Sequence, residues 1–308
     1  MRLIRGLHNL QRCQRGGAVT IGNFDGLHRG HQAVLRQLHA QATRQQLVTT
    51  VMTFEPTPQE YFAPDTAPAR LQRLRDKLSM LRSLEIDQVL CLRFGPALAE
   101  LTAEEFVQRI LVDGLQARYL VVGDDFRFGK GRRGDFAFLQ RAGEQHGFEV
   151  ASTHTFMEGD ERVSSTRVRQ ALQNGDLAVA QRLLGHPYRI CGRVGYGQQR
   201  GRSIGFPTAN LRLHRNVSPL RGVFAVRVTG LDLEPLSGVA NVGTRPTVDG
   251  KHWMLEVHLF DFAVDIYGRY IDVEFCAKLR DEKKFESFDA LKQQIERDAE
   301  QARRFFRE

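Results

Sequence analysis

The stretch from Ala18 to Gln41, AVTIGNFDGLHRGHQAVLRQLHAQ, decides how the first half of the chain folds. A short apolar run, AVTI, leads through a glycine-containing turn into apolar residues at helical spacing. This order predicts a strand, a tight turn and a helix. His28 and His31 fall three positions apart at the predicted helix start, so both imidazoles lie on one face of that helix.

The same order of segments continues along the first half. Apolar runs suited to buried strands alternate with amphipathic stretches suited to helices, and Thr102 and Glu105 have the spacing of a helix capping box. Such alternation favours a doubly wound parallel sheet, and we predict an α/β domain over residues 1–184. The predicted strands are 18–24, 47–54, 88–94 and 118–123, and the predicted helices are 31–41, 70–81 and 102–111.

After Gly185 the helical period disappears. Short β-like segments separated by glycine turns follow, which predicts a small β-barrel domain over residues 185–308. The boundary rests on this change of period and on Gly185 as a helix-stopping residue. Apolar residues at helical spacing after Ser287 predict a terminal helix. The predicted strands are 188–194, 222–228, 236–243, 253–260 and 270–279.

The bulk composition is that of an ordinary globular protein. A length of 308 residues suits two domains, with 42% hydrophobic and 26% charged residues. Charge interrupts the first residues before any apolar run reaches the length of a signal peptide or membrane span, so we expect a cytoplasmic protein without a membrane partner. The four cysteines lie far apart, which argues against a disulfide framework or a zinc site.

A net charge of +8 suits either a nucleic-acid binder or an enzyme that handles nucleotides and phosphorylated substrates. The basic residues are spread along the chain without a compact block, and no aromatic RNA-recognition run is present. We therefore expect small-molecule substrates and no nucleic-acid partner.

The predicted turn before the first helix has the features of an anion site. A helix N-terminus offers free backbone N–H groups and the positive end of the helix dipole, so His28 and His31 can hold ATP phosphates there. Ordinary surface histidines near a turn are the alternative. Their place after the first strand, at the edge where open α/β sheets bind ligands, favours the functional interpretation.

Two motifs now resemble a known family. H-R-G-H resembles the H-x-G-H signature of the nucleotidyltransferase superfamily, and the longer Gly22–His31 is similar to its flavin-adenylylating branch. The run 163–169, VSSTRVR, resembles the second signature, I-S-S-T-x-I-R, with valines in place of isoleucines. The resemblance implies catalytic roles for His28 and His31. The ATP-binding residues that it implies in this half are Gly22, Phe24, His28, His31, Ser165, Thr166 and Arg169.

The residues of the second motif also have a local interpretation. Ser165 and Thr166 suit the cap of a helix, and Arg169 would project from its first turn toward a bound phosphate. A cap alone would leave the neighbouring Arg162, Arg167 and Arg169 unexplained. Arg162 is a weaker candidate for contact with ATP or with the phosphate of FMN.

A glycine-rich loop at 122–135, VGDDFRFGKGRRGD, resembles the flavin-binding loop of the same family, and the resemblance implies flavin contacts by Asp125 and Phe126. The glycine spacing does not meet the P-loop pattern. Its basic residues suit either a solvated loop or substrate contact. The loop 53–58, TFEPTP, fits the wall of a flavin pocket, although a plain turn would need the same residues.

The second half contains GRSIGFPTAN at 201–210, which resembles the riboflavin kinase signature G-x-x-x-G-F-P-T-A-N. Thr208 and Asn210 alternate onto one side of an extended segment and offer oxygen ligands suited to Mg²⁺, and the resemblance implies that they hold the ATP-bound metal. Gly195 belongs to GYGQQRG, whose spacing is wrong for a dinucleotide fingerprint but suits a flexible loop over ATP phosphates.

Glu256 lies in the predicted strand 253–260. It shares a face with His258, while Leu255 and Val257 point to the other side, so the carboxylate can face a ligand as its neighbours fill the core. An exposed strand carboxylate is the alternative. The resemblance implies that Glu256 is the base that accepts the proton of the substrate hydroxyl.

Taken together, the motifs resemble those of bacterial bifunctional riboflavin kinases and FMN adenylyltransferases. The resemblance implies phosphorylation of riboflavin to FMN by ATP, then adenylylation of FMN to FAD with release of pyrophosphate. Riboflavin, FMN and ATP would be substrates, and Mg²⁺ would be the cofactor. The sequence does not identify any flavoprotein client. A protein with one degenerate domain, a flavin-sensing or RNA-binding regulator, and another H-x-G-H enzyme such as a tRNA ligase are the alternatives.

Overall fold

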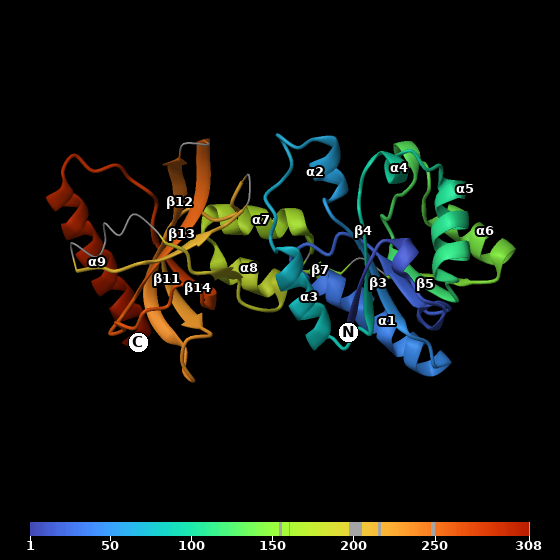
Figure 1. Cartoon of the computed structure of the whole chain (residues 1–308), viewed down its shortest axis with the longest axis horizontal. Coiled ribbons are helices and arrows are strands. Elements are labelled where there is room, and N and C mark those ends of the chain that lie inside the picture. The colour runs from blue at the N-terminus through green and yellow to red at the C-terminus, as the bar shows by residue number, and fades with distance from the viewer. Residues whose placement is uncertain (154–155, 160, 197–204, 215–216, 248–249, 308) are drawn as a thin grey trace. The chain divides into compact units, whose positions relative to one another are not determined.

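The structure is a computed structural model of the chain. It describes residues 1–153, 156–159, 161–196, 205–214, 217–247 and 250–307. The chain divides into two compact units. The first unit consists of Met1–Pro68 and Gln72–Ser164, and the second consists of Ala69–Leu71 and Ser165–Glu308. Figure 1 shows the elements of each.

The first unit contains a six-stranded sheet in the order β1-β4-β3-β2-β5-β6, and its paired strands are all parallel. From β2 the chain winds outward through β3 and β4, then returns to pair β5 with the other side of β2. This reversal is a topological switch point, where open α/β sheets bind ligands at the carboxyl ends of the strands. The strands are β1 Arg2–Arg5, β2 Ala18–Ile21, β3 Thr49–Phe54, β4 Gln88–Leu92, β5 Tyr119–Gly123 and β6 Glu149–Thr153.

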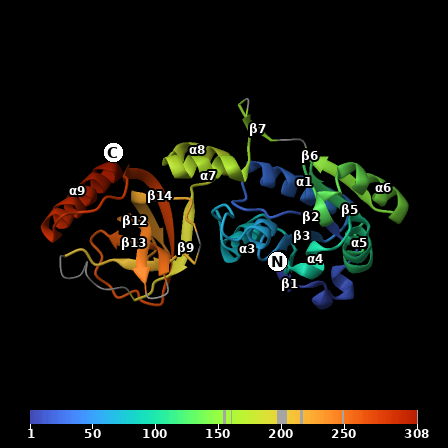
Figure 2. The ribbon, with the colours of Figure 1, turned by 90° about the horizontal axis from the view of Figure 1, so that it is seen from above.

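Helices cover both faces of this sheet. On one face α1 (Arg29–Gln45) and α3 (Leu74–Ser83) pack against alternate residues of β3, β4 and β5. On the other face α5 (Ala103–Phe106), continued by a π-helical stretch Val107–Leu115, packs together with α6 (Phe136–His146). Figure 2 shows α1 and α5 on opposite sides of the strands. The predicted doubly wound architecture is confirmed.

Local chemistry sets several boundaries of these helices. The predicted capping box is present, with the Thr102 side chain accepting from the Glu105 N–H and the Glu105 carboxylate accepting from the Thr102 N–H. The remaining elements are the short helices α2 Pro58–Phe62 and α4 Pro96–Ala99, the 3-10 turns Leu7–Asn9, Arg12–Gln14 and Lys130–Arg132, and the hairpin β7 Met157–Glu158 with β8 Glu161–Arg162.

The second unit contains a six-stranded antiparallel sheet in the order β10-β13-β12-β11-β14-β9. The Gly195 N–H donates to the Asn210 carbonyl oxygen at 2.8 Å, which joins the end of β9 to β10 and nearly closes the sheet into the predicted barrel. The strands are β9 Arg189–Arg193, β10 Ala209–Arg212, β11 Gly222–Thr229, β12 Leu236–Thr247, β13 Gly250–Leu259 and β14 Tyr270–Arg280.

Helices α7, α8 and α9 belong to the same compact unit as this barrel. The terminal helix α9 (Phe288–Arg307) begins after Ser287, whose hydroxyl accepts from the Ala290 N–H, and it packs through Ala299 and Ala302 against β11 and β12 (Figure 1). Helices α7 (Ser165–Asn174) and α8 (Leu177–Leu184) precede the barrel. At the turn between them, a Cβ on Gly175 would lie 2.2 Å from Cδ of Lys278 in β14.

The domain boundary at residues 184 and 185 remains a prediction. Helix α8 ends at Gly185 in the left-handed conformation, as the sequence predicts. By contact, however, α7 and α8 group with the barrel rather than with the first sheet.

Candidate active sites

A strained turn links β2 to α1 at the switch point of the first sheet. The non-glycine residues Phe24 and Leu27 both have positive φ, 47° and 42°, and both side chains are almost fully buried. Gly22 allows this packing, because a Cβ there would lie only 3.2 Å from the Phe24 ring. Backbone held in this region is uncommon and clusters at ligand sites.

His28 caps α1 in place of the usual serine or aspartate. Its Nδ1 accepts the backbone N–H of His31 at 3.3 Å, and the two imidazole rings stack with centroids 3.6 Å apart. The Phe24 ring lies 5.2 Å from the ring of His31. The predicted placement of both histidines at one helix start is therefore present.

The pKa of His31 lies well below its ordinary value, chiefly because the ring is desolvated and also because His28 and Lys77 add positive charge nearby. His31 is therefore neutral at neutral pH and can donate one N–H. Its Nδ1 is shielded from solvent and has no hydrogen-bond partner among the described residues. An anionic ligand would be stabilised by the positive charge near this turn and could accept a hydrogen bond from the His31 ring.

Lys77 is a functional candidate that the sequence did not indicate. It lies on α3, is 3% exposed, and its Nζ donates to the carbonyl oxygen of Asn23 and to Oγ1 of Thr53. These contacts join the turn after β2 to the end of β3. A buried ammonium here adds positive charge to the histidine turn.

The run 163–169, which resembles the second nucleotidyltransferase signature, leads into α7. Ser165 and Thr166 are the first two residues of this helix, so they lie inside it and not at its predicted cap. Nε of Arg169 donates to the carbonyl oxygen of Ala69 at 2.6 Å. These residues belong to the second compact unit, whereas His28 and His31 belong to the first. Their joint action on ATP therefore remains a prediction.

Two of the residues predicted to contact the flavin lie next to each other. Nη2 of Arg162, in β8, lies 2.7 Å from Oδ2 of Asp125, in the loop after β5. Phe126 stacks on Phe128 with ring centroids 5.7 Å apart. Among the basic residues of this loop, Lys130 pairs with Glu100 at 2.6 Å on the surface, which favours a structural role for that lysine.

Aromatic rings gather where β3 and β4 end. The rings of Tyr61, Phe62 and Phe94 lie 5.1 to 5.6 Å from one another, and Phe54 lies 5.7 Å from Phe94. Phe62 is 67% exposed. This cluster follows the TFEPTP loop and offers a flat apolar surface that a ring system can stack on. The sequence indicated the loop but not the rings.

In the second unit, strand register brings the predicted kinase residues together. Asn210 of β10 pairs with Glu256 of β13, which in turn pairs with Asn241 of β12. Residues paired across antiparallel strands point to the same face, so these three side chains form one row. The opposite face carries Leu211, Leu255 and Val242, which fill the barrel core.

Glu256 is held by an arginine that the sequence did not single out. Both carboxylate oxygens contact Arg245 of β12, with Arg245 Nε donating to Oε1 at 3.2 Å and Nη2 donating to Oε2. The hydrogen bond with Glu256 raises the pKa of Arg245. The side chains of Glu256 and Arg245 remain 26% and 44% exposed, so solvent reaches the ion pair.

Thr208 and Asn210 are compatible with a magnesium ion that takes most of its ligands from phosphates and water. Nδ2 of Asn210 donates to the Thr208 carbonyl oxygen at 3.1 Å, and this contact does not use the Asn210 amide oxygen. Two neutral oxygens suit Mg²⁺, which usually keeps waters and substrate phosphates. No cluster of three acidic, histidine or cysteine ligands occurs in the part of the chain that the structure describes. Gly195 lies beside Asn210, while residues 197–204 lie outside the described residues.

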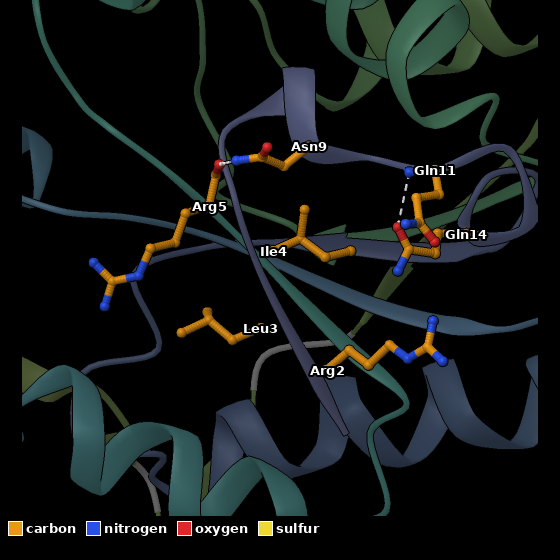
Figure 3. A pocket seen from close by; sticks show the side chains of 7 residues that line it. All are labelled: Arg2, Leu3, Ile4, Arg5, Asn9, Gln11 and Gln14. Atoms are coloured by element: carbon orange, nitrogen blue, oxygen red, sulfur yellow. Dashed lines mark hydrogen bonds between the residues drawn. The ribbon is translucent and has the colours of Figure 1, made fainter.

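A separate shallow cavity of about 500 Å³ lies beside edge strand β1. In Figure 3 the guanidinium groups of Arg2 and Arg5 point away from each other, and the Asn9 amide donates to the Arg5 carbonyl oxygen at 2.6 Å. Its polar groups therefore do not converge on a ligand.

Comparisons with known proteins identify a family for each half of the chain. Residues 10–167 match the FAD synthetase family, and residues 184–306 match the riboflavin kinase family. Curated relatives described as bifunctional riboflavin kinase/FMN adenylyltransferase include those of Escherichia coli strain K12, 56% identical over 99% of this chain and 98% of the relative, and Haemophilus influenzae, 52% identical over 99% of both.

A solved structure described as a macrolide-efflux protein from Streptococcus pneumoniae is 32% identical, with a TM-score of 0.82 over 98% of this chain and 99% of that one. In the described part of the chain, no helix combines the length and apolar character needed to cross a membrane. The two matched families account for nearly the whole sequence. The chain belongs to the family of bifunctional riboflavin kinases and FMN adenylyltransferases.

Proposed function

We propose that the row Asn210–Glu256–Asn241 is the centre of riboflavin phosphorylation. The observation that supports it is the register, which places the predicted base beside a predicted metal ligand on adjacent strands. Glu256 would leave Arg245 and accept the proton of the riboflavin hydroxyl as that oxygen bonds to the γ-phosphorus of ATP and ADP departs.

Thr208 and Asn210 would hold Mg²⁺, which neutralises phosphate charge when bound. Gly195 would lie near the ATP phosphates at the start of the glycine loop. Asn241 is added as a candidate for orienting the flavin or the base, because it flanks Glu256 in the same row.

In the first unit we propose that the turn between β2 and α1 is the centre of FMN adenylylation. An oxygen of the FMN phosphate would attack the α-phosphorus of ATP, with pyrophosphate as the leaving group. His28, neutral His31 and Lys77 would stabilise charge that grows on the departing phosphates, because hydrogen-bond donors and positive charge face that turn. Gly22 and Phe24 shape the turn.

The flavin would lie against the exposed Phe62 and its aromatic neighbours. Asp125, Phe126 and Arg162 are proposed as further flavin contacts, with Arg162 exchanging Asp125 for the FMN phosphate. ATP contacts by Ser165, Thr166 and Arg169 complete the proposal. A cytoplasmic location and the absence of a nucleic-acid partner also remain proposals.

Separated variants test this division of roles. Glu256→Ala should stop formation of FMN from riboflavin but spare conversion of supplied FMN to FAD. His28→Ala combined with His31→Ala should do the reverse. Chromatographic analysis of the flavin products measures both steps, and a block of the same step in both variants would contradict the assignment.

A further inference from the structure

His258 ties the strand of the proposed base to the turn of the proposed metal ligands. It lies on β13 two residues after Glu256, and its Nδ1 is 2.9 Å from the carbonyl oxygen of Pro207. A carbonyl oxygen only accepts, so the ring donates Nδ1–H. Pro207 directly precedes Thr208 in the chain.

The ring of His258 is fixed by its neighbours. Phe206 meets it at a centroid distance of 5.0 Å and an angle of 66°, and Phe260 meets it at 5.9 Å and 70°. Burial lowers its pKa, and the charge of Arg303 lowers it further, against the raising effects of Asp261 and of the bond to Pro207. His258 is thus a neutral donor at neutral pH and adds no positive charge beside a cation site.

The bond matters because of where it acts. Pro207 has no backbone N–H, so its carbonyl oxygen is its one main-chain hydrogen-bonding group. Pairing of Ala209 with Val257 begins the strand just after Thr208, and the bond from His258 extends this attachment back across the turn. The bond therefore links the imidazole to the backbone that leads directly into Thr208.

We infer that His258 is a positioning residue of the kinase site: its Nδ1–H holds the Pro207–Thr208 backbone where Thr208 and Asn210 can bind a magnesium nucleotide. The inference rests on the metal role proposed for those two residues. His258 itself would touch neither substrate nor metal.

Two substitutions separate the hydrogen bond from the bulk of the ring. His258→Leu fills much of the space but has no donor, whereas His258→Asn places an amide N–H near the position of Nδ1. We expect His258→Leu to weaken binding of Mg²⁺–ADP about tenfold, the equivalent of about one net hydrogen bond, and His258→Asn to restore most of the loss. Calorimetric titration with ADP, in the presence of Mg²⁺ and again with excess chelator, measures this directly.

Kinetics give a second readout. His258→Leu should raise KM for Mg²⁺–ATP in riboflavin phosphorylation more than it lowers kcat. Conversion of supplied FMN to FAD should stay unchanged, which verifies that the first unit is folded. Equal behaviour of the leucine and asparagine variants, or wild-type affinity for Mg²⁺–ADP in His258→Leu, would overturn the inference.

Thr208→Val distinguishes failure of this inference from failure of the proposed function. If Thr208→Val leaves the magnesium-dependent affinity for ADP unchanged, the proposed metal role is wrong. If Thr208→Val weakens it and His258→Leu does not, only the positioning role falls.

Discussion

Replacement of Glu256 by glutamine removes the proposed base while keeping its size. The ion pair that it breaks is of the surface kind, since the side chains of Glu256 and Arg245 are 26% and 44% exposed. Such pairs contribute about 0–1 kcal/mol, so the folded protein should lose little stability. Loss of a general base lowers the rate by about 10²- to 10⁴-fold. We therefore predict that Glu256→Gln lowers riboflavin phosphorylation by at least about a hundredfold with a nearly unchanged melting temperature.

Arg245→Gln is the matched control, because it breaks the same ion pair but leaves the carboxylate. We expect it to keep riboflavin phosphorylation within about tenfold of wild type. Chromatography of FMN formed from riboflavin, with FAD formed from supplied FMN as the internal reference, measures both variants. Equal losses in Glu256→Gln and Arg245→Gln would refute the assignment of Glu256 as the base.

Three further predictions concern stability and flavin binding. The pKa of His31 lies below its unfolded value of 6.5, so on acidification the unfolded chain binds the proton first. The stability present above pH 6.5 should therefore fall as the pH is lowered, by at most about tenfold in the folding constant per pH unit. Urea unfolding at pH 7.5 and 5.5 should show a larger loss of stability for wild type than for His31→Leu, and equal losses would contradict this. Asp298 is 3% exposed, and its carboxylate pairs with the guanidinium of Arg280 at 2.7 Å. Asp298→Ala should therefore lower the free energy of unfolding by about 3 kcal/mol in denaturant titrations. A loss below about 1 kcal/mol would show that the fold does not depend on this pair. Phe62→Ala should raise KM for FMN in adenylylation about tenfold through lost stacking without changing KM for riboflavin in the kinase assay; an unchanged KM for FMN would remove the ring from the flavin site.

The sequence was informative wherever chemistry and spacing are local. The histidine pair, its helix start and the capping box at Thr102 all depend on residues within a few positions of one another, and the structure confirms their placement. The alternation of strands and helices likewise indicated the doubly wound sheet. The sequence did not predict edge strand β1, because Arg2 and Arg5 interrupt its apolar pattern. This strand pairs with the sheet on one side only, through β4.

Residues whose roles depend on tertiary contacts could not be found this way. Lys77 lies in an amphipathic helix, where a lysine is expected at the surface, and only the packing of α3 over the histidine turn buries it. Arg245 and Asn241 lie on a strand whose neighbours are set by register, and a shift of one residue would turn them to the other face. The row around Glu256 therefore required the structure.

Incubation of the purified chain with riboflavin, ATP and Mg²⁺, followed by separate quantification of FMN, FAD and pyrophosphate, tests the central claim most directly. We predict that FMN forms first, that FAD follows, and that one pyrophosphate appears for each FAD. Riboflavin that remains bound but unchanged, or FAD that forms only when FMN is supplied, would contradict a chain with two working sites.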